Sequence, residues 1–254
     1  MDLGLKGKRA IVTGGSRGIG RAIVECLIAE GARVATCARG EAGFAALREA
    51  VSDPAALRTR AVDVTDPEGV KAWFADAVAW LGGLDILVSN VGIQSTGQGE
   101  ERWITGLQGD LLQHVRLVEL ALPQLFQSDA AAITIINSEA NVMVNLPRTS
   151  EAYAVFKAGL VNYAAQLALR YAKRGVRVNN VSPSAIIFPG GGWDRQREQN
   201  SDLYRNAIAM SDFGRLGTAE EIARTVVFLS SPASSWTTNV NVRVDGGTVK
   251  APNY

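Results

Sequence analysis

Apolar runs and amphipathic stretches alternate along the whole chain. Short apolar segments predict buried strands, and longer stretches with apolar residues three and four positions apart predict helices. Strands are expected at 8–13, 33–37, in a segment ending at 63, and at 84–89, 131–137, 177–182 and 241–244. Helices are expected from the end of the glycine-rich turn 14–20 to residue 30, and at 41–51, 67–81, 101–126, 152–173 and 219–229.

Several helix ends carry their own signals. Asp66 precedes Pro67, which suits an N-cap followed by proline at the first helical position. Gly175 follows the last residues of a predicted helix, as a C-cap glycine does. Thr218 and Glu221 have the spacing of a capping box. Residues 183–200 show no periodicity, so we expect an irregular segment there.

Strands separated by helices of this length indicate βαβ units, and hence a parallel sheet covered on both faces. We therefore predict an α/β fold, a single-domain Rossmann-like doubly wound parallel sheet of about seven strands, spanning residues 1–254. Ligands in such sheets bind beyond the carboxyl ends of the strands. The glycine-rich turn, Asn90, Ser138 and Pro183 all follow predicted strands, so they should share one rim.

Composition narrows the possible partners. Apolar residues make up 47% of the 254 residues, charged residues 20%, and the formal net charge is +1. This balance gives no long-range field that would attract nucleic acid or an anionic membrane. No apolar run reaches the length of a bilayer span, and the charged first residues do not resemble a signal peptide.

Cysteine and histidine are too scarce for most metal or redox sites. Cys26 and Cys37 have neither zinc-site nor redox-pair spacing, and we expect both to be reduced packing residues in the cytoplasm. His114 is the sole histidine, so a histidine-rich metal site cannot be built, and no metal is predicted. A Ser-His-Asp triad would require His114, which lies inside a predicted helix.

Tyr153 and Lys157 stand four residues apart and therefore lie one turn apart on one helix face. Tyrosine normally loses its proton near pH 10, which makes it a poor acid–base group at neutral pH. A fixed ammonium nearby favours the phenolate and lowers the tyrosine pKa. Most such pairs are ordinary surface contacts, so the interpretation depends on what precedes them.

The turn that precedes the first helix has the sequence TGGSRGIG, from Thr13 to Gly20. Glycines here let the backbone turn sharply and approach a pyrophosphate, which the helix N-terminus attracts. The strand–turn–helix context favours dinucleotide binding over an ordinary glycine turn. The residues expected to contact the dinucleotide here are Gly14, Ser16, Arg17, Gly18, Ile19 and Gly20.

The end of the second strand indicates which dinucleotide binds. An acidic residue there would bind the ribose 2′-hydroxyl of NAD, but Ala38 and Arg39 occupy the positions. Arg39 and Arg17 could pair with the 2′-phosphate of NADP. We expect NADP(H) rather than NAD(H); the alternative is that Arg39 is only a solvated loop charge.

Taken together, these motifs resemble the short-chain dehydrogenase/reductase family over essentially the whole chain. The matching motifs are TGGSRGIG, Asp63-Val64, Ser89-Asn90-Val91-Gly92, Ser138 with Tyr153 and Lys157, Arg177-Val178-Asn179 with Pro183, Gly214-Arg215-Leu216 and Val244-Asp245-Gly246-Gly247. The resemblance implies hydride transfer between a nicotinamide and a carbonyl or secondary alcohol of a small molecule.

The same resemblance assigns roles at matching positions. Tyr153 would exchange the proton, Lys157 would bind the nicotinamide ribose and lower the tyrosine pKa, and Ser138 would bind the substrate oxygen. Asn90, with Gly92 beside it, would line the dinucleotide. Asp63 and Val64 would lie beside the adenine.

Three departures from the family pattern bear on catalysis. Asp110 stands where the family often has an asparagine that supports a relay to the lysine. Its carboxylate could pair with Lys157 and weaken the pull of that lysine on Tyr153, it could be protonated and donate as an amide does, or it could face solvent.

The second departure is the fifteen-residue separation of Ser138 and Tyr153, which is longer than usual, with Glu139 next to the serine. Glu139 could contact a cationic or polyhydroxylated substrate. Third, Ser184 follows Pro183, and the backbone of Ile186 is expected to replace a threonine that contacts the nicotinamide carboxamide.

Two further expectations concern surfaces. Residues 184–211 mix Trp193, glycines and charges, which suits a substrate lid or a plain surface loop. The helices at 101–126 and 152–173 are more apolar than one sheet face can cover, which predicts a homodimer or homotetramer packed through them. The alternative to an enzyme is a catalytically weak NADP-binding regulatory or scaffold protein.

Overall fold

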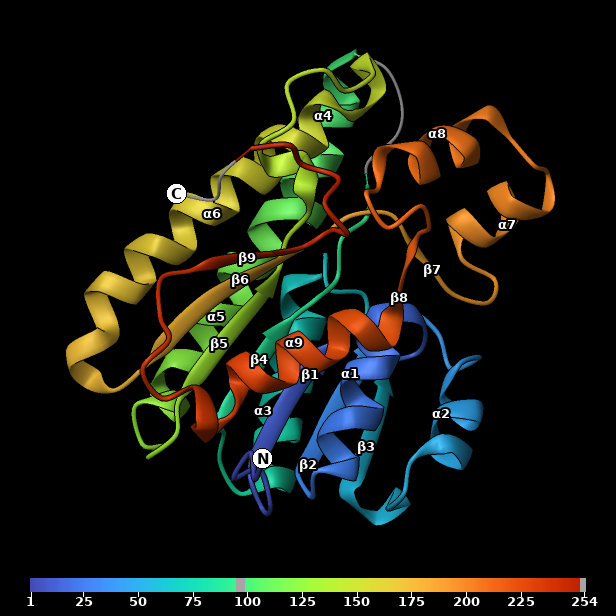
Figure 1. Ribbon diagram of the computed structural model, residues 1–254. Helices are drawn as coiled ribbons and strands as arrows, with labels where there is room; N and C mark the ends of the chain where they lie inside the picture. Colours follow the sequence, from blue (N-terminus) through green and yellow to red (C-terminus); the bar gives the residue numbers. More distant parts are fainter. Residues whose placement is uncertain (95–98, 252–254) are drawn as a thin grey trace.

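The computed structural model describes residues 1–94 and 99–251 and has three layers (Figure 1). Within the described residues, seven strands form one parallel sheet in the order β3-β2-β1-β4-β5-β6-β9. The strands are β1 (Arg9–Thr13), β2 (Arg33–Ala38), β3 (Leu57–Ala61), β4 (Ile86–Ser89), β5 (Ala132–Ile136), β6 (Arg177–Pro183) and β9 (Asn241–Val244). The predicted doubly wound α/β fold is confirmed, and strand order reverses between β1 and β4.

Helices cover both faces of this sheet. One face packs against α1 (Gly18–Ala29), α2 (Phe44–Ala50) and α9 (Ala219–Ser230). The other packs against α3 (Pro67–Leu81), α5 (Gln113–Leu125) and α6 (Glu151–Tyr171). Each face has its own buried apolar cluster, because the parallel strands bear apolar side chains in both directions. No helix within 1–94 and 99–251 is long and apolar enough to cross a membrane.

The predicted helix signals are present. Asp66 accepts a hydrogen bond from the Glu68 N–H at the start of α3. Gly82 ends α3 in the left-handed conformation, with φ +78°. Thr218 and Glu221 form the reciprocal bonds of a capping box on α9. Local sequence chemistry therefore fixed these boundaries.

The expected single helix 101–126 is interrupted. It consists of α4 (Gly99–Gly106), a π-helical turn (Leu107–Leu112) and α5. The π turn contains Asp110, whose carboxylate reaches out of the helix to the backbone N–H of Ile93. Wide turns of this kind often stand at functional sites.

The expectation of an irregular segment at 183–200 is wrong in part. The chain forms β7 (Ile186–Ile187), which pairs with β8 (Gly217–Thr218), and then two short helices, α7 (Gly192–Glu198) and α8 (Asp202–Met210). Side chains start both helices locally: Asp194 binds the Gly190 N–H, and Ser201 caps α8. In Figure 1, α7 and α8 lie outside the layers of the main sheet, beyond β7 and β8.

Candidate active site

The carboxyl ends of four adjacent central strands, β1, β4, β5 and β6, bring the predicted site residues to one rim. The glycine-rich turn follows β1, Asn90 follows β4, Ser138 lies just beyond β5, and Pro183 ends β6. Tyr153 and Lys157 approach this rim from α6. The sequence positions predicted to share an edge therefore do so.

Asn90 anchors the start of the dinucleotide turn, residues 14–20, through hydrogen bonds to Thr13. The side-chain Nδ2 of Asn90 donates to the Thr13 carbonyl at 2.8 Å, and the Asn90 N–H donates to the Thr13 hydroxyl at 3.0 Å. A Cβ on Gly14 or Gly20 would come within 2.8 or 2.6 Å of that amide nitrogen. Glycine is thus required at both positions by the close approach of Asn90.

Helix α1 begins at Gly18 without a capping side chain. Arg17 is its N-cap residue, and no side-chain hydrogen bond satisfies the first N–H groups of the helix. Free N–H groups at a helix start attract an anion, and the helix dipole adds to the attraction. The turn therefore fits a pyrophosphate.

Positively charged side chains lie near the carboxyl end of β2. Arg39 is exposed, as is Arg17 in the turn, and the Arg39 charge contributes to the low pKa of Asp63. That pKa is lowered first by the Thr65 N–H and then by the Thr65 hydroxyl, which both bond the Asp63 carboxylate. Val64 is buried in the core, so its side chain packs inward.

Tyr153 and Lys157 lie together on α6, with the Lys157 Nζ 5.6 Å from the centre of the Tyr153 ring. Lys157 is 2% exposed and donates to the Ile136 carbonyl at 3.0 Å. Burial lowers the pKa of Lys157 to about 8, and the negative charge of Asp110 opposes this. The ammonium is thus enclosed beside the tyrosine and anchored to the end of β5.

The prediction that the tyrosine pKa is lowered is wrong for this structure. Burial raises the pKa of Tyr153 to about 12 and outweighs the hydrogen bonds with the side chains of Ser138 and Gln94, which lower it. Asp110 and Glu139 add to the rise through their negative charge. Tyr153 therefore holds its proton at neutral pH.

Asp110 is fully buried, so it does not face solvent. Its Oδ1 accepts from the Ile93 N–H at 2.8 Å and from the Gln94 N–H at 3.3 Å. A Cβ on Gly92 would lie 3.3 Å from this oxygen and 3.5 Å from the Lys157 Nζ, which places both charged groups around Gly92. Of the expected alternatives, the solvent-facing one is therefore wrong, and the carboxylate paired with Lys157 and the protonated carboxyl both stay predictions.

Ser138 caps a short 3₁₀ turn, Glu139–Asn141, by accepting from the Ala140 N–H at 3.2 Å. The side chain of Asn137 accepts from the Ser138 N–H at 2.9 Å and donates to Asn180 on β6. These bonds fix the serine at the end of β5, where its side chain meets Tyr153. The longer spacing to Tyr153 is thus accommodated in the loop between them.

Glu139 has one carboxylate oxygen, Oε2, that is buried without a partner. Burial, with the charge of Asp245, raises the pKa of this carboxyl to about 7. Next to it, the Asn141 side chain donates to the Ser182 hydroxyl, which donates to Asn241. This chain of polar groups ties the serine loop to β6 and β9.

Two residues in the site were not found from the sequence. Gln94 bonds Tyr153 and has φ 48°, a strained value for a residue other than glycine that is often associated with function. The ring of Phe188 lies against Gly18. Neither position carries a motif, so no sequence signal indicated them.

Ile186 is 6% exposed and forms part of β7, where it pairs with Gly217. Its side chain packs in the core, and contact between its backbone and the nicotinamide carboxamide stays a prediction. Within the described residues, no group of three or more histidine, cysteine, aspartate or glutamate side chains could hold a metal.

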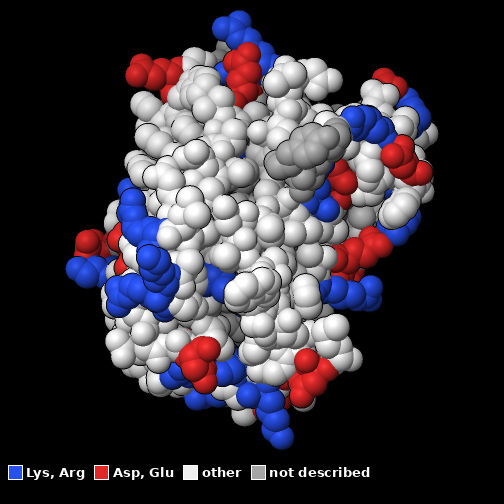
Figure 2. Space-filling model, turned by 60° about the vertical axis from the view of Figure 1, so that its left-hand side comes forward, with Lys and Arg blue, Asp and Glu red and all other residues white. Residues whose placement is uncertain are grey.

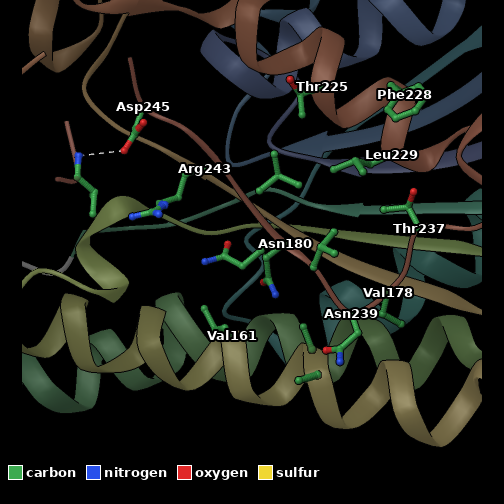
Figure 3. A pocket seen from close by; sticks show the side chains of 16 residues that line it. Val161, Val178, Asn180, Thr225, Phe228, Leu229, Thr237, Asn239, Arg243 and Asp245 are labelled. Carbon is green, nitrogen blue, oxygen red and sulfur yellow. Dashed lines mark hydrogen bonds between the residues drawn. The ribbon is translucent and has the colours of Figure 1, made fainter. Parts of the chain in front are cut away.

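A groove of about 850 Å³ lies elsewhere, along β9 between α6 and α9 (Figure 3). Asn180, Asn239 and Arg243 point into it, with Phe228 of α9 on the far wall. None of the predicted site residues lines this groove, so it is not the site that contains Tyr153.

Comparison with known proteins gives matches over nearly the full length. A family model described as "Enoyl-(Acyl carrier protein) reductase" matches residues 14–249. A 3-oxoacyl-[acyl-carrier-protein] reductase of Vibrio harveyi is 34% identical over 249 residues, covering 96% of this chain and 98% of that protein. An isoepoxydon dehydrogenase of Aspergillus clavatus is 31% identical over 247 residues, covering 96% and 95%.

Comparison with solved structures also gives matches over nearly the full length. A double mutant of a short-chain dehydrogenase/reductase from Serratia marcescens superposes with a TM-score of 0.88 at 28% identity, covering 96% of this chain and 99% of that chain.

Proposed function

Because the chain belongs to the short-chain dehydrogenase/reductase family, we propose that it is an NADP(H)-dependent oxidoreductase with Tyr153 as its acid–base residue. It would transfer a hydride between the nicotinamide and a carbonyl or secondary alcohol of a small molecule. The observation that carries the proposal is the enclosed Tyr153–Lys157 pair, which meets Ser138 on the rim that also bears the dinucleotide turn.

The residues present fit the dinucleotide. The uncapped start of α1 suits the pyrophosphate, and exposed Arg17 and Arg39 suit the 2′-phosphate. Lys157 and the backbone of Ile186 would hold the nicotinamide half. The bound cofactor supplies the hydride, and the protein supplies position and electrostatics.

In the direction of reduction, the Tyr153 hydroxyl donates its proton to the carbonyl oxygen as charge develops there. The Ser138 hydroxyl donates a hydrogen bond to the same oxygen. Burial raises the pKa of Tyr153 to about 12, so its hydroxyl carries the proton at neutral pH. Lys157 adds positive charge beside the ring, and Asp110 moderates it.

The substrate is a ketone or a secondary alcohol. The relatives named as 3-oxoacyl-[acyl-carrier-protein] reductase and isoepoxydon dehydrogenase both support this class. Segment 184–211, with α7 and α8, would close over it as a lid.

The test follows NADPH absorbance with a panel of ketones, diketones and 3-oxoacyl thioesters. We expect turnover that falls at least about a hundredfold in Tyr153→Phe, since acid–base catalysis contributes about that factor or more. Tyr171→Phe on the same helix is the control, because its ring contact with Phe126 survives the change. Cofactor binding without tyrosine-dependent turnover would favour the regulatory or scaffold protein instead.

Cofactor choice has its own test. Arg39→Asp removes a cation and places a carboxylate where the ribose 2′-hydroxyl of NADH would bind. We expect the preference for NADPH over NADH to fall by about tenfold or more, in line with the loss of one charge-assisted bond. An unchanged ratio of the two kcat/KM values would mean that Arg39 is only a surface charge.

We also propose a homodimer or homotetramer packed through the 101–126 and 152–173 helices. Leu169 and Val155 on α6 are 74% and 53% exposed. Figure 2 shows that the side bearing α6 has few charged side chains at its centre, with Lys, Arg, Asp and Glu around it. Exposed apolar side chains on α6 favour burial against a second copy.

A further inference from the structure

The ring of Phe188 occupies the space beside Gly18 that a side chain would otherwise fill. A Cβ built on Gly18 would lie 2.8 Å from two carbons of this ring, Cε1 and Cζ. Gly18 also has φ +56°, a left-handed value that favours glycine, so both its backbone and the neighbouring ring disfavour a side chain there. The contact joins the dinucleotide turn to the lid segment.

The other glycines of the turn face fixed parts of the core. Gly14 and Gly20 lie against Asn90, and Gly15 lies against Thr36 of β2. Of these four glycines, only Gly18 meets a residue of the lid. Gly18 is also the first residue of α1, where the helix N–H groups would face the pyrophosphate.

The Phe188 ring and a pyrophosphate cannot both occupy the space beside Gly18. A phosphate is charged and strongly hydrated, whereas the Phe188 ring packs with the apolar cluster under α1. The ring therefore shields part of the surface to which the pyrophosphate would bind.

The segment that bears Phe188 lies between a short strand and a short helix. It follows β7, a two-residue strand that pairs with β8, and it leads into α7. The Phe188 carbonyl accepts from the Gly191 N–H at 3.0 Å, and a Cβ on Gly191 would also meet the ring at 3.0 Å. Residues 188–191 thus form one short turn between β7 and α7, and this turn and the first residue of α7 include Gly190, Gly191 and Gly192.

We infer that Phe188 is a gate on the dinucleotide turn: its ring rests on Gly18 and leaves when the pyrophosphate binds. This inference rests on the proposed dinucleotide site. Binding of the cofactor then displaces the start of the lid, and the observed affinity is reduced by the fraction of molecules in which the gate is closed. Cofactor binding and lid position are coupled in both directions.

The experiment measures NADPH binding by titration calorimetry, without any substrate. Phe188→Ala removes the ring, so we expect the Kd to fall about fivefold, as it does when a gate closed in about four fifths of the molecules is removed. Phe188→Leu keeps a smaller apolar side chain and should give an intermediate Kd. Phe213→Ala is the matched control, because Phe213 is 73% exposed and belongs to neither the dinucleotide turn nor the turn at 188–191.

The outcomes separate this inference from the proposed function. Unchanged NADPH binding by Phe188→Ala and Phe188→Leu, with wild-type binding intact, would overturn the gate. Weaker binding would also overturn it and would mean that the ring contacts the bound cofactor. Absence of binding in the wild-type protein would instead overturn the dinucleotide site itself. Circular dichroism checks that each variant is folded, and Phe188→Leu decides the matter if the alanine variant is not.

Discussion

The carboxyl of Glu139 offers the sharpest prediction, because its environment is unfavourable to charge. It follows Ser138 directly, its Oε2 is buried without a partner, and burial with the nearby charge of Asp245 raises its pKa to about 7. The change Glu139→Gln keeps the shape and removes the ionisation. We expect it to stabilise the protein at alkaline pH.

The sign and size follow from proton linkage. The folded state holds the Glu139 proton up to about pH 7, whereas the unfolded chain loses it near 4.5, so stability falls as pH rises through that window. A rise from 4.5 to about 7 corresponds to about 3 kcal/mol at ~1.4 kcal/mol per pKa step. Since the side chain keeps part of its surface exposed, we expect about 2 kcal/mol.

The assay compares wild type and Glu139→Gln by urea unfolding at pH 4 and pH 8.5, on either side of the two pKa values. The difference in unfolding free energy should be near zero at pH 4 and about 2 kcal/mol in favour of the variant at pH 8.5. This equals a rise in Tm of about 4–8 °C for a chain of this size. Glu49→Gln, at an exposed position on α2, is the control for losing one negative charge. A pH-independent difference would refute the reasoning.

Three further predictions concern other parts of the molecule. Asp110→Asn removes a charge that raises the pKa of both Lys157 and Tyr153, so the alkaline limb of the kcat profile should move to lower pH; an unchanged profile would contradict this. Leu169→Asp should shift the mass by light scattering from an oligomer toward a monomer, and a monomeric wild type would rule out the proposed interface. Thr218→Ala should cost about 1 kcal/mol in urea unfolding through loss of the helix cap, and no change would mean that the capping box is dispensable.

Much of the fold was predictable because its signals are local. The start of α3 at Asp66-Pro67 and the capping box of α9 each depend on residues within one turn of helix. The last strand, β9, matches its predicted bounds, and the third strand ends two residues before the predicted position at Asp63. The shared rim of the site residues was predictable as well, because parallel strands have their carboxyl ends on the same edge of the sheet.

The remaining features depend on contacts between distant residues. The π turn forms where Asp110 binds the backbone of Ile93 and Gln94, and helical periodicity does not encode that contact. The tyrosine pKa was predicted from one neighbour, Lys157, whereas burial and two acidic groups decide it. Phe188 looks like an ordinary loop residue until the fold brings it to Gly18.

The π turn at Leu107–Leu112 also has an evolutionary consequence. Its hydrogen bonds span five residues rather than four, so it holds one residue more than a regular helical turn. Deleting Leu111 or Leu112 would restore a continuous helix and rotate everything before the deletion, Asp110 included, by roughly 100° relative to α5. Asp110 would then swing away from Lys157 while α5 kept its packing on the sheet. A single codon, gained or lost, could therefore add or remove a buried charge behind the acid–base pair.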